Sequence, residues 1–269
     1  MRIGVALLLL GCAVAQAASL EFVRDGAVVR RLDEATLART CGVRTIEVDD
    51  PYYEARKRYR ACPLAAVLAA GFDAPADRLG AEDVLFRALD GYVKPVTLER
   101  VREDGGFVAF RELDRPSGFA PMGRRGLDPG PFYVVWTKPE QHDPHRYPWP
   151  YQLAAIELAS IRTKFPHTVP EGLATTDAGW HGYDIFRTEC VACHSMNGEG
   201  GTVGPDLNVP RSIVEYRPAD QVKSYVRNPA TFRYGNMPSH EHLSEPDLDA
   251  LLAYFRAMKD RKHDPGGRP

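Results

Sequence analysis

Apolar and polar positions follow a period of two in the first two thirds of this chain and a helical period in the last third. Residues 45–48 alternate polar and apolar side chains, residues 49–51 (Asp-Asp-Pro) form a turn signal, and residues 56–60 follow as a returning strand. A β-hairpin is therefore predicted here. Four further strands are predicted at residues 84–92, 106–110, 132–136 and 153–158.

A short helix is predicted at residues 63–70, with a proline in its first turn and Gly71 after its end. Together these elements predict a mixed α+β, β-rich domain over residues 20–165. The proline-containing stretch 166–176 is then predicted to be an extended linker.

The last third is predicted to be an all-α domain over residues 177–262. Helices are expected at residues 177–187, at residues 218–227 and from the cap signal Ser244-Glu245-Pro246 onwards. In the last of these, apolar residues recur at helical spacing at positions 248, 251, 252, 255 and 258. Residues 263–269 are expected to be a disordered tail.

The first 17 residues have the pattern of a signal peptide. Met1-Arg2 precedes an apolar run over residues 3–10, and Ala15-Gln16-Ala17 fits the cleavage pattern. A second interpretation is a lipobox, in which Cys12 becomes a lipidated N-terminus. Either way we expect export to the periplasm, and no later run is long and apolar enough to span a membrane.

Composition and charge narrow the function only a little. Hydrophobic residues make up 44% of the chain and charged residues 26%, which is typical of a globular protein. The 34 basic and 36 acidic residues nearly cancel, so a nucleic acid is not an expected partner.

The strongest chemical signal is Cys190-x-x-Cys193-His194, the attachment pattern of c-type haem. Its two thiols form thioethers with the haem, and the adjacent imidazole is thereby placed at the iron. A thioredoxin-like dithiol would be preceded by a strand and followed by a helix, but a glycine-rich loop over residues 195–201 follows instead. A zinc site would need His240 and His242 as further ligands and would leave the Cys193-His194 adjacency unexplained.

Over about residues 178–259 the chain resembles a class I c-type cytochrome. Its Gly204-Pro205-Asp206-Leu207 is similar to the family loop, which implies that the Pro205 carbonyl accepts a hydrogen bond from His194. Its residues 234–238 are similar to the distal loop, which implies Met237 as the sixth iron ligand. Gly182 and Phe186 match first-helix positions that imply packing across the last helix, near residues 254 and 255.

Elimination among the five methionines also leaves Met237, with His240 and His242 as competitors for the iron. A six-coordinate iron predicts single-electron transfer to a redox partner protein rather than bond-making chemistry. Arg233, beside the distal loop, is either a partner of a haem propionate or a solvated loop residue.

The remaining cysteines predict a disulfide. Pairing Val48 with Ala55 in the hairpin places Cys41 opposite Cys62, and an exported chain favours a bridge there.

The first domain resembles the molybdopterin-binding domain of the sulfite oxidase family. The similar features are the Pro63-Leu64 helix start, the Asp90-Gly91-Tyr92 turn and the late strand pair around a proline-rich loop. The family's cysteine ligand for molybdenum falls near residues 49–51, where this chain has no cysteine. The resemblance therefore implies the fold without the cofactor.

Two other histidines carry a weaker signal. His142 and His145 could bind a metal, but they lie in an irregular proline-rich loop, where surface histidines are common.

These observations favour an exported monohaem cytochrome with a molybdopterin-domain-like docking module that lacks molybdopterin. The alternative is an enzyme, a sulfite-dehydrogenase-like molybdenum and haem oxidoreductase. A haem-based sensor would require a labile sixth ligand.

Overall fold

The computed structural model describes residues 18–269 except 124, 234, 236, 265 and 267–269. The predicted signal peptide, Cys12 and two residues of the distal loop thus lie outside the described residues, as does most of the tail. Among the described residues, no helix is long and apolar enough to cross a membrane.

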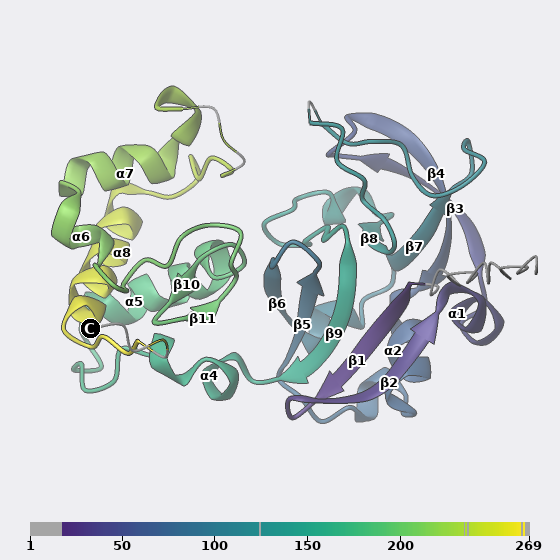
Figure 1. Ribbon diagram of the computed structural model, residues 1–269, viewed down its shortest axis with the longest axis horizontal. Helices are drawn as coiled ribbons and strands as arrows, with labels where there is room; N and C mark the ends of the chain where they lie inside the picture. The colour runs from purple at the N-terminus through teal and green to yellow at the C-terminus, as the bar shows by residue number, and fades with distance from the viewer. Residues whose placement is uncertain (1–17, 124, 234, 236, 265, 267–269) are drawn as a thin grey trace, which may run out of the picture.

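The chain has a β-rich N-terminal region and a helical C-terminal region, which lie side by side and are joined near α4 (Figure 1). The strands of the first region are β1 (Ser19–Arg24), β2 (Ala27–Asp33), β3 (Arg44–Asp50), β4 (Ala55–Pro63), β5 (Asp83–Ala88), β6 (Val93–Thr97), β7 (Gly106–Glu112), β8 (Tyr133–Trp136) and β9 (Leu153–Ala159). Its helices are α1 (Glu34–Thr40), α2 (Leu64–Phe72), α3 (Leu98–Val101) and α4 (Ile161–Lys164).

These strands form two sheets. One has the order β2-β1-β9-β5-β6, in which only the β1–β9 pair is parallel, and the other is the antiparallel sheet β3-β4-β7-β8. Phe22, Val67 and Trp136 are among the fully buried side chains of the core that they share with α2.

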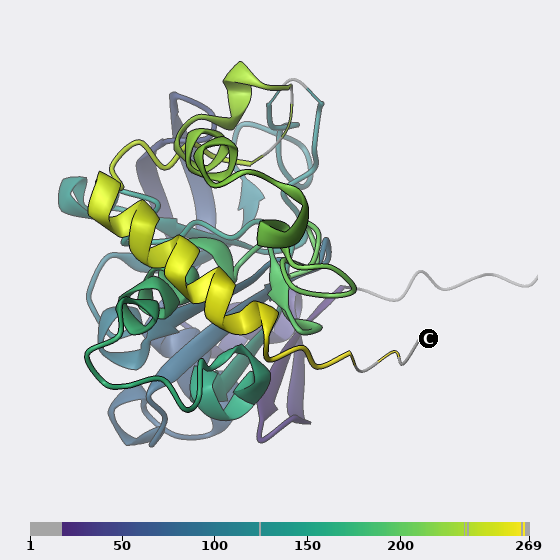
Figure 2. The same cartoon turned by 90° about the vertical axis from the view of Figure 1, so that its left-hand side faces the viewer.

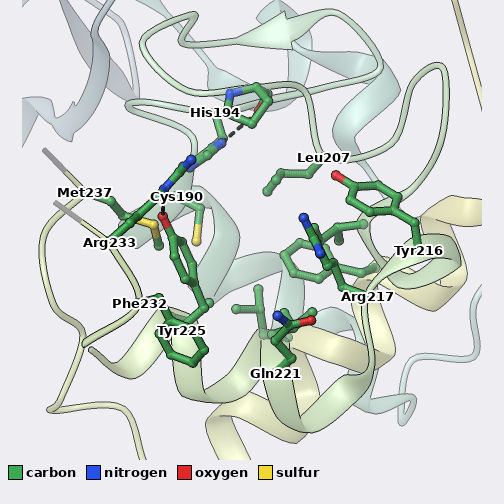
Figure 3. Close-up of a pocket in the computed structure, with 16 residues that line it drawn as sticks. Cys190, His194, Leu207, Tyr216, Arg217, Gln221, Tyr225, Phe232, Arg233 and Met237 are labelled. Carbon is green, nitrogen blue, oxygen red and sulfur yellow. Dashed lines mark hydrogen bonds between the residues drawn. The ribbon is translucent and has the colours of Figure 1, made fainter. Parts of the chain in front are cut away.

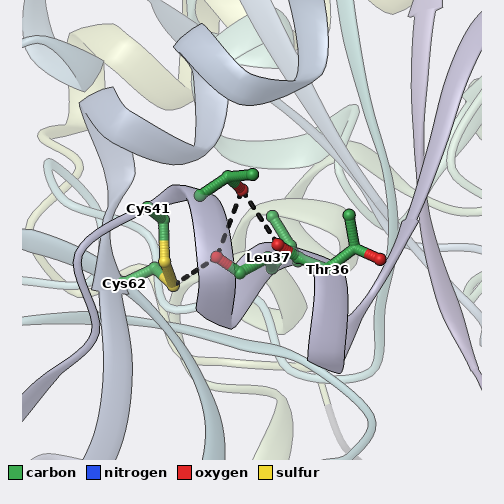
Figure 4. Close-up of a disulfide and its surroundings, with 5 residues drawn as sticks. Thr36, Leu37, Cys41 and Cys62 are labelled. Carbon is green, nitrogen blue, oxygen red and sulfur yellow. Dashed lines mark hydrogen bonds between the residues drawn. A yellow bond between two sulfur atoms is a disulfide. The ribbon is translucent and has the colours of Figure 1, made fainter.

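The predicted hairpin exists, but its predicted register is wrong by two residues. Asp50 pairs with Ala55, and Val48 pairs with Lys57. Cys41 is not in the strand at all, because it follows the last residue of α1. The structure nevertheless contains the Cys41–Cys62 disulfide, with a Cα–Cα distance of 5.6 Å (Figure 4).

Two element boundaries also differ from the prediction. The predicted strand 84–92 ends at Ala88, and the chain turns and returns as β6. Gly71 lies inside α2 rather than after its end, and the helix ends one residue later. A β-carbon at position 71 would fall 1.9 Å from the Phe22 ring. Helix α2 packs against β1 at this position, and only glycine fits.

The C-terminal region contains α5 (Ala178–Ile185), α6 (Ile213–Tyr216), α7 (Ala219–Arg227) and α8 (Glu245–Lys259), with the short strands β10 (Ser195–Met196) and β11 (Glu199–Gly200). Helix α8 begins where the sequence predicts. The Ser244 hydroxyl accepts from the backbone N–H of Asp247 at 3.3 Å, and the Asp247 carboxylate accepts from the Ser244 N–H at 3.0 Å.

Helices α5 and α8 pack closely. A β-carbon at Gly182 would fall 2.0 Å from the Ala250 carbonyl oxygen, and the rings of Phe186 and Tyr254 lie 5.3 Å apart. Figure 2 shows α8 running across the face of this region.

The two regions touch through their backbones. The Val93 N–H donates to the Ala192 carbonyl at 2.9 Å, and the Thr202 N–H donates to the Gly91 carbonyl at 2.9 Å. Leu85 and Phe165 belong to the hydrophobic cluster of the C-terminal region, so the two regions share apolar contacts as well.

Candidate functional site

The two cysteines of the motif lie at the end of α5. This helix continues into a single π-helical turn, Phe186–Cys190, which brings Cys190 to the wall of a cavity. The next turn is closed by the His194 N–H, which donates to the Cys190 carbonyl at 2.9 Å. The segment that carries the motif is therefore ordered by its own backbone.

Both thiols are unsuited to disulfide exchange. Burial, assisted by Glu189, raises the pKa of Cys190 to about 12, and burial, assisted by Asp90, raises the pKa of Cys193 to about 11. Exchange needs a thiolate near neutral pH, which reactive dithiols obtain from a lowered pKa. These pKa values therefore argue against the thioredoxin-like interpretation.

The His194 ring is held in one tautomer. Its Nδ1 donates to the Pro205 carbonyl oxygen at 2.8 Å, because a carbonyl can only accept. This leaves Nε2 with a lone pair for a metal. Gly204 permits the arrangement, since a β-carbon there would fall 2.4 Å from Cε1 of the His194 ring.

A cavity of about 430 Å³ lies beside these residues (Figure 3). Cys190, His194 and Met237 all contribute to its wall, and most of the remaining wall is apolar. The other lining residues are Pro205, Leu207, Ile213, Tyr216, Arg217, Gln221, Val222, Tyr225, Val226, Phe232, Arg233, Leu251 and Phe255.

His240 and His242 do not line this cavity. Both point a ring nitrogen toward Glu189, at 3.4 and 3.5 Å from its Oε2. Met237 is thus the thioether that shares the cavity with His194, while the two competing histidines face the Glu189 carboxylate.

Arg233 lies on the cavity wall with its guanidinium beside Tyr225. Its Nε donates to the Tyr225 hydroxyl at 2.9 Å. Arg217, which the sequence analysis did not single out, lines the same cavity (Figure 3). Two cationic side chains are therefore available to a ligand that carries carboxylates.

The position of the molybdenum ligand in the sulfite oxidase resemblance holds a fully buried aspartate. The Asp50 carboxylate accepts from the Tyr59 hydroxyl at 2.9 Å, from the Tyr133 hydroxyl at 3.2 Å and from two backbone N–H groups at 3.0 and 3.2 Å. Burial raises the pKa of Asp50, and these hydrogen bonds work against that effect. The Asp50 carboxylate is therefore already engaged by hydrogen bonds within the protein.

Neither cysteine of the first domain offers a free thiol. Cys41 and Cys62 are bonded to each other, and the free cysteines among the described residues are Cys190 and Cys193.

Comparison with known proteins agrees with this arrangement. Residues 181–259 match the family model "Cytochrome c". The chain is 30% identical over 86 residues to cytochrome c oxidase subunit 2 of Alkalihalophilus pseudofirmus, covering 29% of this chain and 25% of that protein.

Two further relatives match over similar lengths. Thiosulfate dehydrogenase of Thiomonas intermedia is 34% identical over 90 residues, covering 31% of this chain and 27% of that protein. Lupanine 17-hydroxylase [cytochrome c] of a Pseudomonas species is 38% identical over 84 residues, covering 30% of this chain and 11% of that protein. The matches thus span about a quarter or less of each relative.

The cavity fits the cofactor that this family implies. Its wall combines the Cys190 thiol, an imidazole with a free Nε2, a thioether and mostly apolar side chains, and Cys193 follows Cys190 by three residues in the same turn. Residues 181–259 are therefore a cytochrome c domain, which implies haem c as its cofactor and supports electron transfer as its chemistry.

Proposed function

We propose that the chain is an exported monohaem cytochrome that transfers single electrons between redox partner proteins. The observation that supports this best is the cavity shared by His194, with its free Nε2, and Met237. One Cys-x-x-Cys-His motif in the sequence supports a single haem.

The residues have separate roles in this proposal. Cys190 and Cys193 would attach the haem, and His194 and Met237 would be the ligands of its iron. Pro205 fixes the imidazole through its carbonyl and raises its basicity. Haem, when bound, would supply a one-electron couple, and with His194 and Met237 both engaged its chemistry would be electron transfer rather than bond making.

The surrounding side chains tune this couple. The apolar wall excludes water, which favours the iron state of lower charge. Arg233 and Arg217 provide positive charge for the haem propionates.

The first domain, in this proposal, is a docking module of the sulfite oxidase type that lacks molybdopterin. Support comes from Asp50, whose carboxylate accepts four hydrogen bonds, and from the Cys41–Cys62 disulfide, which removes both sulfurs as ligands. Molybdenum of that family needs a protein thiolate. The signal-peptide pattern of residues 1–17 supports a periplasmic location.

Ligand replacement tests the iron site. Met237→Leu should abolish the weak charge-transfer band that methionine-ligated ferric haem shows at the red end of the visible spectrum. Met196→Leu, a similar change at a buried methionine in β10, should leave the band intact. Persistence of the band in Met237→Leu would move the sixth ligand elsewhere.

Metal analysis tests the proposed cofactor content, one haem and no molybdenum. Purified protein should contain about one iron per chain, retained through acid-acetone extraction, and no stoichiometric molybdenum. Stoichiometric molybdenum, with anaerobic reduction of the haem by sulfite, would instead establish the dehydrogenase alternative.

A further inference from the structure

Four metal-binding side chains from three segments meet where the two regions touch. His145 comes from the loop between β8 and β9, Glu189 from the π-helical turn before Cys190, and His240 and His242 from the loop before α8. One ligand atom of each lies within 4.8 Å of the ligand atoms of the other three.

All three imidazoles point at one carboxylate oxygen. The distances to Glu189 Oε2 are 2.9 Å from His145 Nδ1, 3.4 Å from His240 Nδ1 and 3.5 Å from His242 Nε2. One oxygen is the common neighbour of three nitrogens that ligate metals in proteins.

His240 gives a further reason to expect a ligand. Its side chain is buried, with only 3% of the residue exposed, yet its Nδ1 makes no well-formed hydrogen bond and has only the long 3.4 Å contact with Glu189 Oε2. A buried polar atom without a partner costs about 1–3 kcal/mol, so native structures seldom leave one unsatisfied. A bound cation at this nitrogen removes that cost.

The backbone holds two of these histidines in place. The His145 N–H donates to the Asp143 carboxylate at 3.0 Å, and the His240 N–H donates to the Val226 and Arg227 carbonyls at 3.2 and 3.1 Å. These hydrogen bonds hold His145 in the β-rich region and His240 in the C-terminal region whether or not a metal is bound.

We propose that His145, Glu189, His240 and His242 bind one divalent transition-metal ion, with zinc as the best fit. Three imidazole nitrogens and one carboxylate oxygen make the four-coordinate set that zinc prefers. Tetrahedral bonds of about 2.0–2.2 Å place ligand atoms about 3.3–3.6 Å apart. The contacts of His240 and His242 with Glu189, at 3.4 and 3.5 Å, lie in this range, and the 2.9 Å contact of His145 would lengthen on binding. The Lys94 ammonium, which is close enough to act on Glu189 electrostatically, donates its hydrogen bond to the Thr188 carbonyl.

The ion would join the two regions. His145 belongs to the β-rich region, and the other three ligands belong to the cytochrome c domain, on segments adjoining Cys190 and Met237. We therefore expect metal binding to fix how the first domain sits against the haem.

The test uses the full haem-loaded protein, stripped with a chelator and titrated with Zn²⁺. Wild type should bind one Zn²⁺ per chain, and binding Co²⁺ at the same site should produce the visible bands of tetrahedral cobalt. His145→Ala and His242→Ala should each weaken binding by at least about 100-fold, since loss of a residue that only supports a ligand already costs 10- to 100-fold.

The matched control is His181→Ala. His181 is also an exposed histidine beside a carboxylate, Asp247 at 2.7 Å, but no further histidine or carboxylate joins this pair to form a metal-binding group among the described residues. This variant should bind Zn²⁺ like wild type. An unchanged haem spectrum in each variant shows that it is folded and that the iron site is separate.

Two results would overturn the proposal. One is wild type that binds Zn²⁺ no more tightly than His145→Ala. The other is tight binding that survives in the His145→Ala and His242→Ala variants, which would place the ion elsewhere. Neither result bears on haem ligation by Met237.

Discussion

Gly182→Ala tests how closely α5 and α8 must approach for the cytochrome c domain to be stable. The added β-carbon would lie 2.0 Å from the Ala250 carbonyl oxygen and 2.7 Å from Cβ of Tyr254, whereas real β-carbons keep at least about 3.0 Å. The helices must therefore separate by about 1.0 Å, because the obstacle is backbone and no rotamer change relieves it.

The magnitude follows from two opposing effects. Overpacking of a close-packed contact costs about 1–3 kcal/mol, with a backbone obstacle at the upper end. Alanine regains up to about 1 kcal/mol of helix propensity over glycine. We expect the free energy of unfolding of the domain to fall by about 2 kcal/mol.

Guanidinium unfolding of the haem-loaded protein, followed by far-UV circular dichroism and haem absorbance, measures this change. Gly179→Ala, on the same helix, is the matched control. Its β-carbon would meet the end of the flexible Leu173 side chain at 2.7 Å, and this side chain can move. A Gly182→Ala protein as stable as Gly179→Ala would refute the packing argument.

Two further predictions concern the disulfide and the start of α8. Replacing Cys41 and Cys62 together by alanine opens a bridge between residues 21 apart and should lower the free energy of unfolding of the first domain by about 3 kcal/mol. Wild type unfolded in the presence of reductant should lose the same amount. An unchanged urea midpoint in the double variant would count against this stabilisation. Hydrogen bonds from Ser244 and His181 lower the pKa of Asp247 from 3.8 to about 2. Because the folded-state pKa is depressed, this carboxylate stabilises the fold fully above about pH 4 and loses that effect as the pH falls toward 2. Melting temperatures measured over this range should fall less steeply in Asp247→Asn, and parallel curves would be the contrary result.

Local signals predicted the parts of the molecule in which neighbours in sequence are neighbours in space. The motif at residues 190–194 and the capping box at Ser244 are each complete within a few residues, so the sequence alone carries them. The disulfide partners were predicted, but from a hairpin register that the structure does not have. The bridge exists because α1 delivers Cys41 to β4, and nothing in the local pattern indicates where that helix docks.

The histidine cluster had only weak local signals, and nothing in the sequence indicated that His145 would meet His240 and His242. His145 and His242 are almost a hundred residues apart, and each lies in a polar loop where a solvent-exposed histidine is the usual outcome. Gly71 shows the same limit in the core, because glycine usually ends a helix, and only the Phe22 ring explains why this one lies inside α2.

The backbone around Cys190 and Cys193 ties the haem-attachment turn to the first domain. Every carbonyl from Cys190 to Cys193 accepts a hydrogen bond, and the one on Ala192 accepts from Val93 of the first domain. Thioethers at Cys190 and Cys193 would fix this turn to the haem, so one short segment would be held by the cofactor and by the edge strand β6 at once. A displacement of the haem would therefore reach β6 through backbone rather than through flexible side chains.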